Sequence, residues 1–81
     1  MNPRVQNVRA EKNYKIRIWF DNGEIKLFNV KPYLKTGLFS ELKDPSIFFS
    51  VKPFMGSIQW NNSLDLCPDT LYEEGQAIKE G

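Results

Sequence analysis

The chain has 81 residues, 41% of them hydrophobic, and its 11 Lys and Arg nearly balance 10 Asp and Glu. This length supports one small domain, and the net charge of +1 excludes a global field that would draw the protein to nucleic acid or to an anionic membrane. One cysteine, Cys67, excludes an internal disulfide, and neither a signal sequence nor an apolar run of ~18 residues is present, so we expect a soluble cytoplasmic protein.

The first predicted elements are strands. Arg4–Arg9 is expected to form a short, bulged edge strand, because Val5 and Val8 are three residues apart rather than two. The segment Tyr14–Phe20 alternates apolar and polar side chains, which is the period of a strand with one buried face. Glu24–Val30 is predicted to be its return strand.

Asn22-Gly23 predicts a two-residue hairpin loop, because both residues tolerate positive φ. This register would pair Phe20 with Ile25 and Ile18 with Leu27 on the core face. The other face would then carry Lys15, Arg17 and Trp19 opposite Val30, Phe28 and Lys26, and would mix basic with apolar groups.

The middle of the chain predicts short helices followed by an edge strand. Leu38–Leu42 has helical apolar spacing, and Asp44 with Pro45 is typical of an N-cap and first helical residue. Ser50–Phe54 is predicted as a strand that Pro53 confines to a sheet edge.

The last third predicts a second hairpin and a terminal helix. A three-residue loop, Asn61–Ser63, would pair Trp60 with Leu64 and Ile58 with Leu66, which keeps the apolar side chains on one face. Ser63 would then adopt positive φ, at a cost of about 1 kcal/mol.

After this hairpin, Pro68 is expected to begin the terminal helix, Gly75 to end it, and Gln76–Gly81 to be a frayed tail. The chain as a whole is expected to form one α+β domain over residues 1–81, with a small antiparallel sheet of four to five strands and two or three short helices.

Catalysis is not expected. The sequence has no histidine, which removes the usual general base and the commonest metal ligand. We interpret Cys67 as a helix-capping residue and Asp65 as a carboxylate that bonds the backbone. We expect no cofactor and no metal.

These segments, in their order and spacing, resemble a bacterial family known as domain of unknown function 2442 over about residues 5–75. The residues that carry the resemblance are Tyr14–Glu24, Phe28–Val30, Leu38–Leu42, Phe48-Phe49, Trp60–Asp69 and Leu71-Tyr72. Asn29 and Ser63 stand where family members usually have aspartate and glycine.

The resemblance implies an α+β fold built on an antiparallel sheet. In some relatives a similar module precedes a helix-turn-helix domain, and stand-alone members lie beside another small uncharacterised family, which implies a regulatory or toxin–antitoxin-like pairing. The 81 residues leave no room for such a DNA-binding helix pair, so a DNA-reading role is not expected.

The candidate binding face consists of Arg17, Trp19, Lys26 and Phe28. Trp and Arg dominate protein interfaces, so the face predicts a non-catalytic protein-interaction module that binds a neighbouring gene product or itself, there or at an open sheet edge. The alternative is weak nucleic-acid binding through Arg17, Trp19 and Lys26. A third interpretation is that short helices cover the face and the charged stems merely lie over it.

Overall fold

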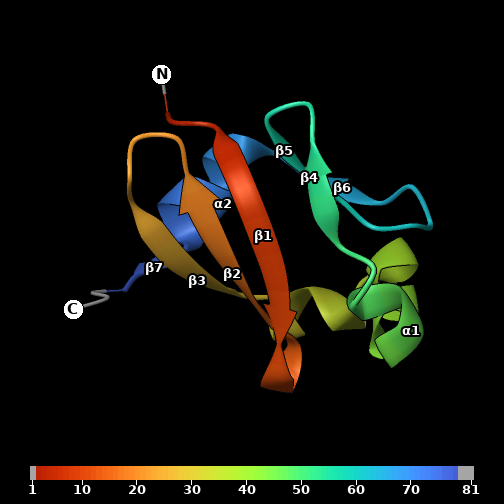
Figure 1. Cartoon of the computed structure of the whole chain (residues 1–81). Coiled ribbons are helices and arrows are strands. Elements are labelled where there is room, and N and C mark those ends of the chain that lie inside the picture. Colours follow the sequence, from red (N-terminus) through yellow and green to blue (C-terminus); the bar gives the residue numbers. More distant parts are fainter. Residues whose placement is uncertain (1, 79–81) are drawn as a thin grey trace.

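The computed structural model describes residues 2–78, which form two antiparallel sheets and several short helices (Figure 1). One sheet has the order β1-β2-β3-β7 and the other β4-β5-β6. The strands are β1 (Val5–Glu11), β2 (Lys15–Phe20), β3 (Ile25–Asn29), β4 (Lys52–Phe54), β5 (Ser57–Gln59), β6 (Asp65–Leu66) and β7 (Gln76–Ala77). The α-helices are α1 (Pro45–Phe48) and α2 (Pro68–Glu74), and the 3-10 helices are η1 (Lys12–Tyr14), η2 (Lys31–Lys35) and η3 (Gly37–Lys43).

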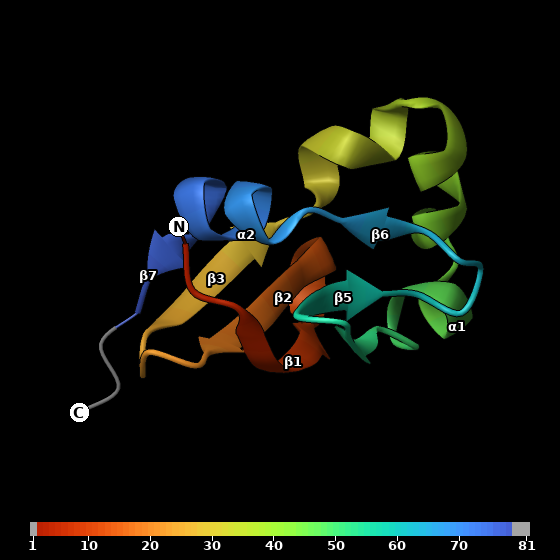
Figure 2. The same ribbon diagram turned by 90° about the horizontal axis from the view of Figure 1, so that it is seen from above.

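The expected α+β class is confirmed, although the strands divide between two sheets instead of forming one. Viewed from above, α2 lies against one face of the β1–β3 sheet, and β5 and β6 lie to the side of that sheet (Figure 2). Buried side chains from both sheets and from α1, α2, η2 and η3 form one cluster. Its largest member, Trp60, is fully buried and donates its indole N–H to the Phe48 carbonyl at 3.1 Å.

The predicted bulge in the first strand is confirmed. Val5 lies opposite Phe20, yet Asn7 lies opposite Trp19, so β1 contains one extra residue at this point. The insertion shifts the alternation of β1, and Val5 and Val8 therefore both face the core.

The predicted register of the first hairpin is wrong by one residue. The Phe20 N–H donates to the Glu24 carbonyl at 2.8 Å, so the loop has three residues rather than two. Gly23 occupies its last position with φ of +90°, which a glycine adopts without strain. In the observed register Ile18 lies opposite Lys26.

A one-residue slip moves every side chain of the return strand to the other face of the sheet. Phe28 and Val30 are therefore buried, and Ile25 and Leu27 lie on the face that was predicted to hold Phe28. Each face of this strand segment carries two apolar residues, Ile25 and Leu27 on one face and Phe28 and Val30 on the other. The hydrophobic pattern therefore does not select between the two registers.

The second hairpin follows the prediction. Ile58 lies opposite Leu66, and the Trp60 N–H donates to the Leu64 carbonyl at 2.9 Å across a three-residue loop. Ser63 has φ of 70°, as expected for the third loop residue.

The predicted helix starts are also confirmed. Asp44 caps α1 by accepting a hydrogen bond from the Ser46 N–H at 3.0 Å, and Pro45 is the first helical residue. Cys67 stands at the N-cap of α2, but its side chain makes no capping hydrogen bond. Asp65 is exposed, and its side chain bonds no backbone group of residues 2–78. The interpretation of Asp65 as a carboxylate that bonds the backbone is therefore wrong.

The expected frayed tail is wrong for residues 76–78. Gln76–Ala77 form β7, which pairs with β3 at the edge of the four-stranded sheet, and the Ile78 N–H donates to the Ile25 carbonyl at 2.9 Å. The rest of the predicted tail lies outside the described residues. Within residues 2–78, no helix is long and apolar enough to cross a membrane.

Candidate functional site

The four residues of the predicted binding face do not share one face of the sheet. Arg17 and Trp19 lie on one side, whereas Lys26 and Phe28 lie on the other, because the hairpin register differs by one residue from the prediction. Phe28 is only 1% exposed and belongs to the core. The prediction that these four side chains form one surface is therefore wrong.

Helix α2 covers the Lys26 side of the sheet. The Lys26 ammonium group donates to the Tyr72 carbonyl and lies 3.7 Å from the centroid of the Tyr72 ring. The Tyr72 hydroxyl in turn donates to the Glu24 carboxylate at 2.7 Å. The third interpretation, in which a short helix covers the face, is therefore correct for Lys26. Its side chain lies over the Tyr72 ring.

The opposite side of the sheet is crossed by no helix or strand of residues 2–78 (Figures 1 and 2). We call this side the open face. It consists of Asn7, Arg9 and Glu11 of β1, Lys15, Arg17 and Trp19 of β2, Ile25, Leu27 and Asn29 of β3, and Gln76 of β7.

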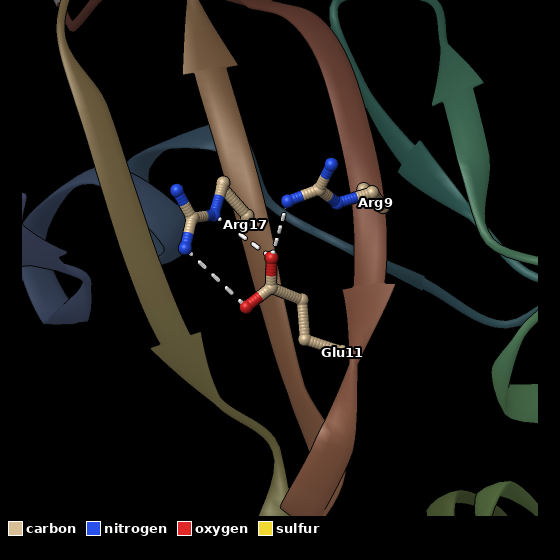
Figure 3. Close-up of polar contacts among 3 residues, drawn as sticks. All are labelled: Arg9, Glu11 and Arg17. Atoms are coloured by element: carbon tan, nitrogen blue, oxygen red, sulfur yellow. Dashed lines mark hydrogen bonds and ion pairs between the residues drawn. The ribbon is translucent and has the colours of Figure 1, made fainter. Parts of the chain in front are cut away.

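A carboxylate joins the two arginines of the open face (Figure 3). Arg9 and Arg17 lie directly opposite each other on β1 and β2, where two like charges repel. The Glu11 carboxylate accepts from the Arg9 guanidinium at 2.7 Å and from the Arg17 Nε at 2.9 Å. The Glu11 carboxylate thus bridges the two cations.

The arginines also change the acidity of Glu11. The hydrogen bond from Arg9 lowers the pKa of the Glu11 carboxyl below its ordinary value, and Arg17 lowers it further, while partial burial opposes both. Glu11 therefore remains ionised at neutral pH, and the cluster keeps one negative charge between two positive ones.

Beside this cluster the open face is apolar. Trp19 is partly buried and lies opposite Ile25, and Leu27 lies opposite Arg17. The Arg9 guanidinium carbon lies 5.6 Å from the centroid of the Trp19 ring, within range of a cation–π interaction. Aromatic and aliphatic surface next to ordered arginines is suited to recognition of another molecule.

Sequence reasoning identified Arg17 and Trp19 but missed Arg9, Glu11 and the two aliphatic residues of β3. The signal for Arg9 and Glu11 was present, since both follow the predicted bulge and alternate with Val8. Extending the strand past Arg9 and pairing it with β2 would have placed them beside Arg17.

Neither the search of curated proteins nor the search of solved structures returned a match to this chain. A family model described as protein of unknown function (DUF2442) matches residues 5–77, which is nearly the whole chain. The family resemblance seen in the sequence is thereby confirmed. The chain belongs to the DUF2442 family of proteins of unknown function.

Proposed function

We propose that this protein is a non-catalytic protein-interaction module whose interface is the open face. The observation that carries the proposal is the uncovered side of the β1–β3 sheet, where Trp19 and two aliphatic side chains adjoin two arginines. A sheet face that a soluble domain does not use for its own core is available for a partner.

The restricted conformations of the two arginine side chains favour binding of a partner. Arg17 retains only 23% side-chain exposure and is fixed by Glu11, so its rotamer entropy is already reduced before a partner arrives. Trp and Arg side chains that lie together in this way are the residues that contribute most at interfaces.

Charge indicates what kind of partner fits. Among residues 2–78, the open face carries three cations, Arg9, Lys15 and Arg17, and the carboxylate of Glu11, so these described residues contribute a net charge of +2. Two copies of this face would repel each other, whereas a protein that presents carboxylates around an apolar centre would complement it.

The family resemblance supports a regulatory or toxin–antitoxin-like pairing with the product of a neighbouring gene, and we assign the partner to that class. The exposed, unpaired thiol of Cys67 supports a reducing cytoplasm as the compartment.

Titration calorimetry between this chain and the purified neighbouring gene product tests the proposal. We expect Trp19→Ala to weaken binding by about tenfold or more, as truncation of an interface tryptophan does. Phe49→Ala is the matched control, because Phe49 is an aromatic residue with 59% exposure outside the open face. Equal affinities of the two variants, or no binding by the parent chain, would contradict the proposal.

Light scattering on the isolated chain provides a second check. Charge repulsion between two open faces predicts a monomer at low ionic strength. A stable dimer that Trp19→Ala dissociates would assign the face to self-association instead.

The nucleic-acid alternative has less support, since the three residues it needs are divided between two faces of the sheet. Arg17 and Trp19 lie on the open face, but the Lys26 ammonium group is bound to α2 on the other side. A saturable, salt-sensitive complex with a short oligonucleotide that Trp19→Ala abolishes would reverse this choice.

A further inference from the structure

A second surface of the molecule collects positive charge around a hollow. The hollow has a volume of about 510 Å³ and lies where β3 ends and η2 begins. Its lining consists of Asn29, Lys31, Pro32, Leu34, Lys35 and Lys43. Two of the lysines come from η2 and the third from the end of η3, so separate segments bring their charges together.

The described residues that line the hollow supply hydrogen-bond donors and no carboxylate. Within the described part of the chain, Lys31, Lys35 and Lys43 have no side-chain hydrogen bond and no ion pair. The side-chain oxygen of Asn29 accepts from the Lys31 N–H at 3.1 Å, which leaves its amide N–H groups as further donors. Lys15 lies directly opposite Asn29 on β2 but does not line the hollow.

Three carboxylates close to η2 and η3 accept hydrogen bonds from residues outside the lining of the hollow, and one of them, Glu74, accepts from the Tyr33 hydroxyl at 2.7 Å. Asp44 follows Lys43 but accepts hydrogen bonds from both the backbone and the hydroxyl of Ser46. Glu41 accepts from the side chain of Asn62 at 3.2 Å. Within residues 2–78, none of these carboxylates forms an ion pair with a lysine of the hollow.

The backbone segments that carry the three lysines are anchored. Leu34 and Leu42 are buried, and the carbonyl of Lys43 accepts a hydrogen bond from the Tyr14 hydroxyl at 2.7 Å. Three lysine side chains that line one hollow without an ion pair among residues 2–78 repel one another, and an anion with several charged oxygens relieves that repulsion.

We propose that this hollow is a binding site for a small oligophosphate. Lysine binds phosphate as a flexible point charge, so several lysines can adapt to the oxygens of one anion. A volume of about 510 Å³ falls within the range of sites that accept small molecules and exceeds what one phosphate ion needs. The hollow shares Asn29 with the open face, but Trp19, Ile25 and Leu27 do not line it, and the inference does not depend on the proposed protein partner.

The test is a titration of the isolated chain at low salt with inorganic phosphate, pyrophosphate and tripolyphosphate, followed by amide NMR shifts. We expect saturable shifts confined to residues 29–35 and 43, with affinity that rises with the number of phosphates. Lys31→Gln combined with Lys35→Gln should weaken tripolyphosphate binding by about tenfold or more.

The matched control combines Lys12→Gln with Lys52→Gln, which removes the same charge from exposed lysines outside the hollow. This control should change the affinity by less than about twofold. Equal losses in the two double variants, or shifts spread over the whole molecule, would overturn the site. An oligonucleotide of about 12 nucleotides that binds these lysines more tightly than tripolyphosphate would overturn the assignment to a small anion.

Discussion

At the scale of single residues, Glu11 has the most distinct role, because it lies between two arginines that the β1–β2 pairing places opposite each other. Replacement by glutamine removes the carboxylate charge that bridges these two facing cations. We expect Glu11→Gln to lower the free energy of unfolding by about 0.5–1 kcal/mol, the range of exposed charge pairs. Urea denaturation measures the change.

Salt provides the control for this prediction. The loss should shrink at about 1 M salt, where repulsion between Arg9 and Arg17 is screened. Asp65→Asn, which removes an exposed carboxylate without a hydrogen-bond partner among residues 2–78, should leave stability unchanged. A salt-independent loss would argue against an electrostatic role for Glu11.

The same residue predicts a pH dependence. Because the arginines lower the pKa of Glu11 in the folded state, the unfolded chain binds its proton more readily. The stabilisation is complete above the unfolded pKa of about 4.3 and is lost as pH falls through the lower, folded value. The stability difference between the parent and Glu11→Gln should therefore vanish in strong acid, measured by denaturation from about pH 6 to 2.

Ser63 is a residue whose backbone conformation conflicts with its type. Its φ of 70° lies in the left-handed region, which favours glycine. We expect Ser63→Gly to raise the free energy of unfolding by about 0.5–1 kcal/mol, since relief of strain exceeds the entropy that glycine adds to the unfolded chain. Ser40→Gly, in a helical segment with ordinary φ, should lower stability in the same thermal melts.

At the scale of elements, the register of β3 can be tested directly. The observed pairing buries Phe28 and leaves Leu27 on the open face. Phe28→Ala should cost about 3–5 kcal/mol, enough to unfold most of a domain of this size, whereas Leu27→Ala should cost far less. Phe28→Leu, a smaller truncation, keeps the comparison measurable by urea denaturation. A greater loss from Leu27→Ala would support the two-residue loop.

The contact of α2 with β3 depends on Gly75. A Cβ at this position would lie 2.5 Å from the Leu71 carbonyl oxygen and 3.1 Å from the Lys26 Cβ. Gly75→Ala should therefore displace the end of α2 and cost about 1–3 kcal/mol, measured by thermal melting. Gln76→Ala, at the next and exposed residue, should have little effect.

At the scale of the whole molecule, the two tryptophans report on different environments. Trp60 is fully buried in the common core, and Trp19 is partly exposed on the open face. In the Trp19→Phe variant, Trp60 is the only tryptophan. Its fluorescence emission should be blue-shifted and resistant to quenching by acrylamide. That emission should move to the red in one cooperative transition on unfolding. Strong quenching of Trp60 in the folded state would contradict the single core.

Much of the fold was predictable because the signals are local. The alternation of β2, the Asp44-Pro45 helix start and the second hairpin each depend on neighbouring residues, and all were confirmed. In the second hairpin only one register keeps Ile58 and Trp60 on the same face as Leu66, so the pattern is decisive.

The candidate site was only half predictable. Arg17 and Trp19 follow from the alternation of β2, whereas Arg9 and Glu11 join them only once β1 has paired with β2 across its bulge. The presence of Phe28 on that face depended on a register that the pattern could not decide.

The sequence by itself determined the fold class, the family, the second hairpin and the residues that begin the helices, since each depends on short-range spacing and backbone preference. Only the tertiary structure decided the register of β3 and hence the composition of the open face. Apolar side chains lie on both faces of β3, so either face could be buried. The packing of α2, with Tyr72 over Lys26, stabilises the register in which Phe28 faces the core. Pairing of β7 with β3 is likewise a long-range contact, which two exposed residues do not reveal on their own.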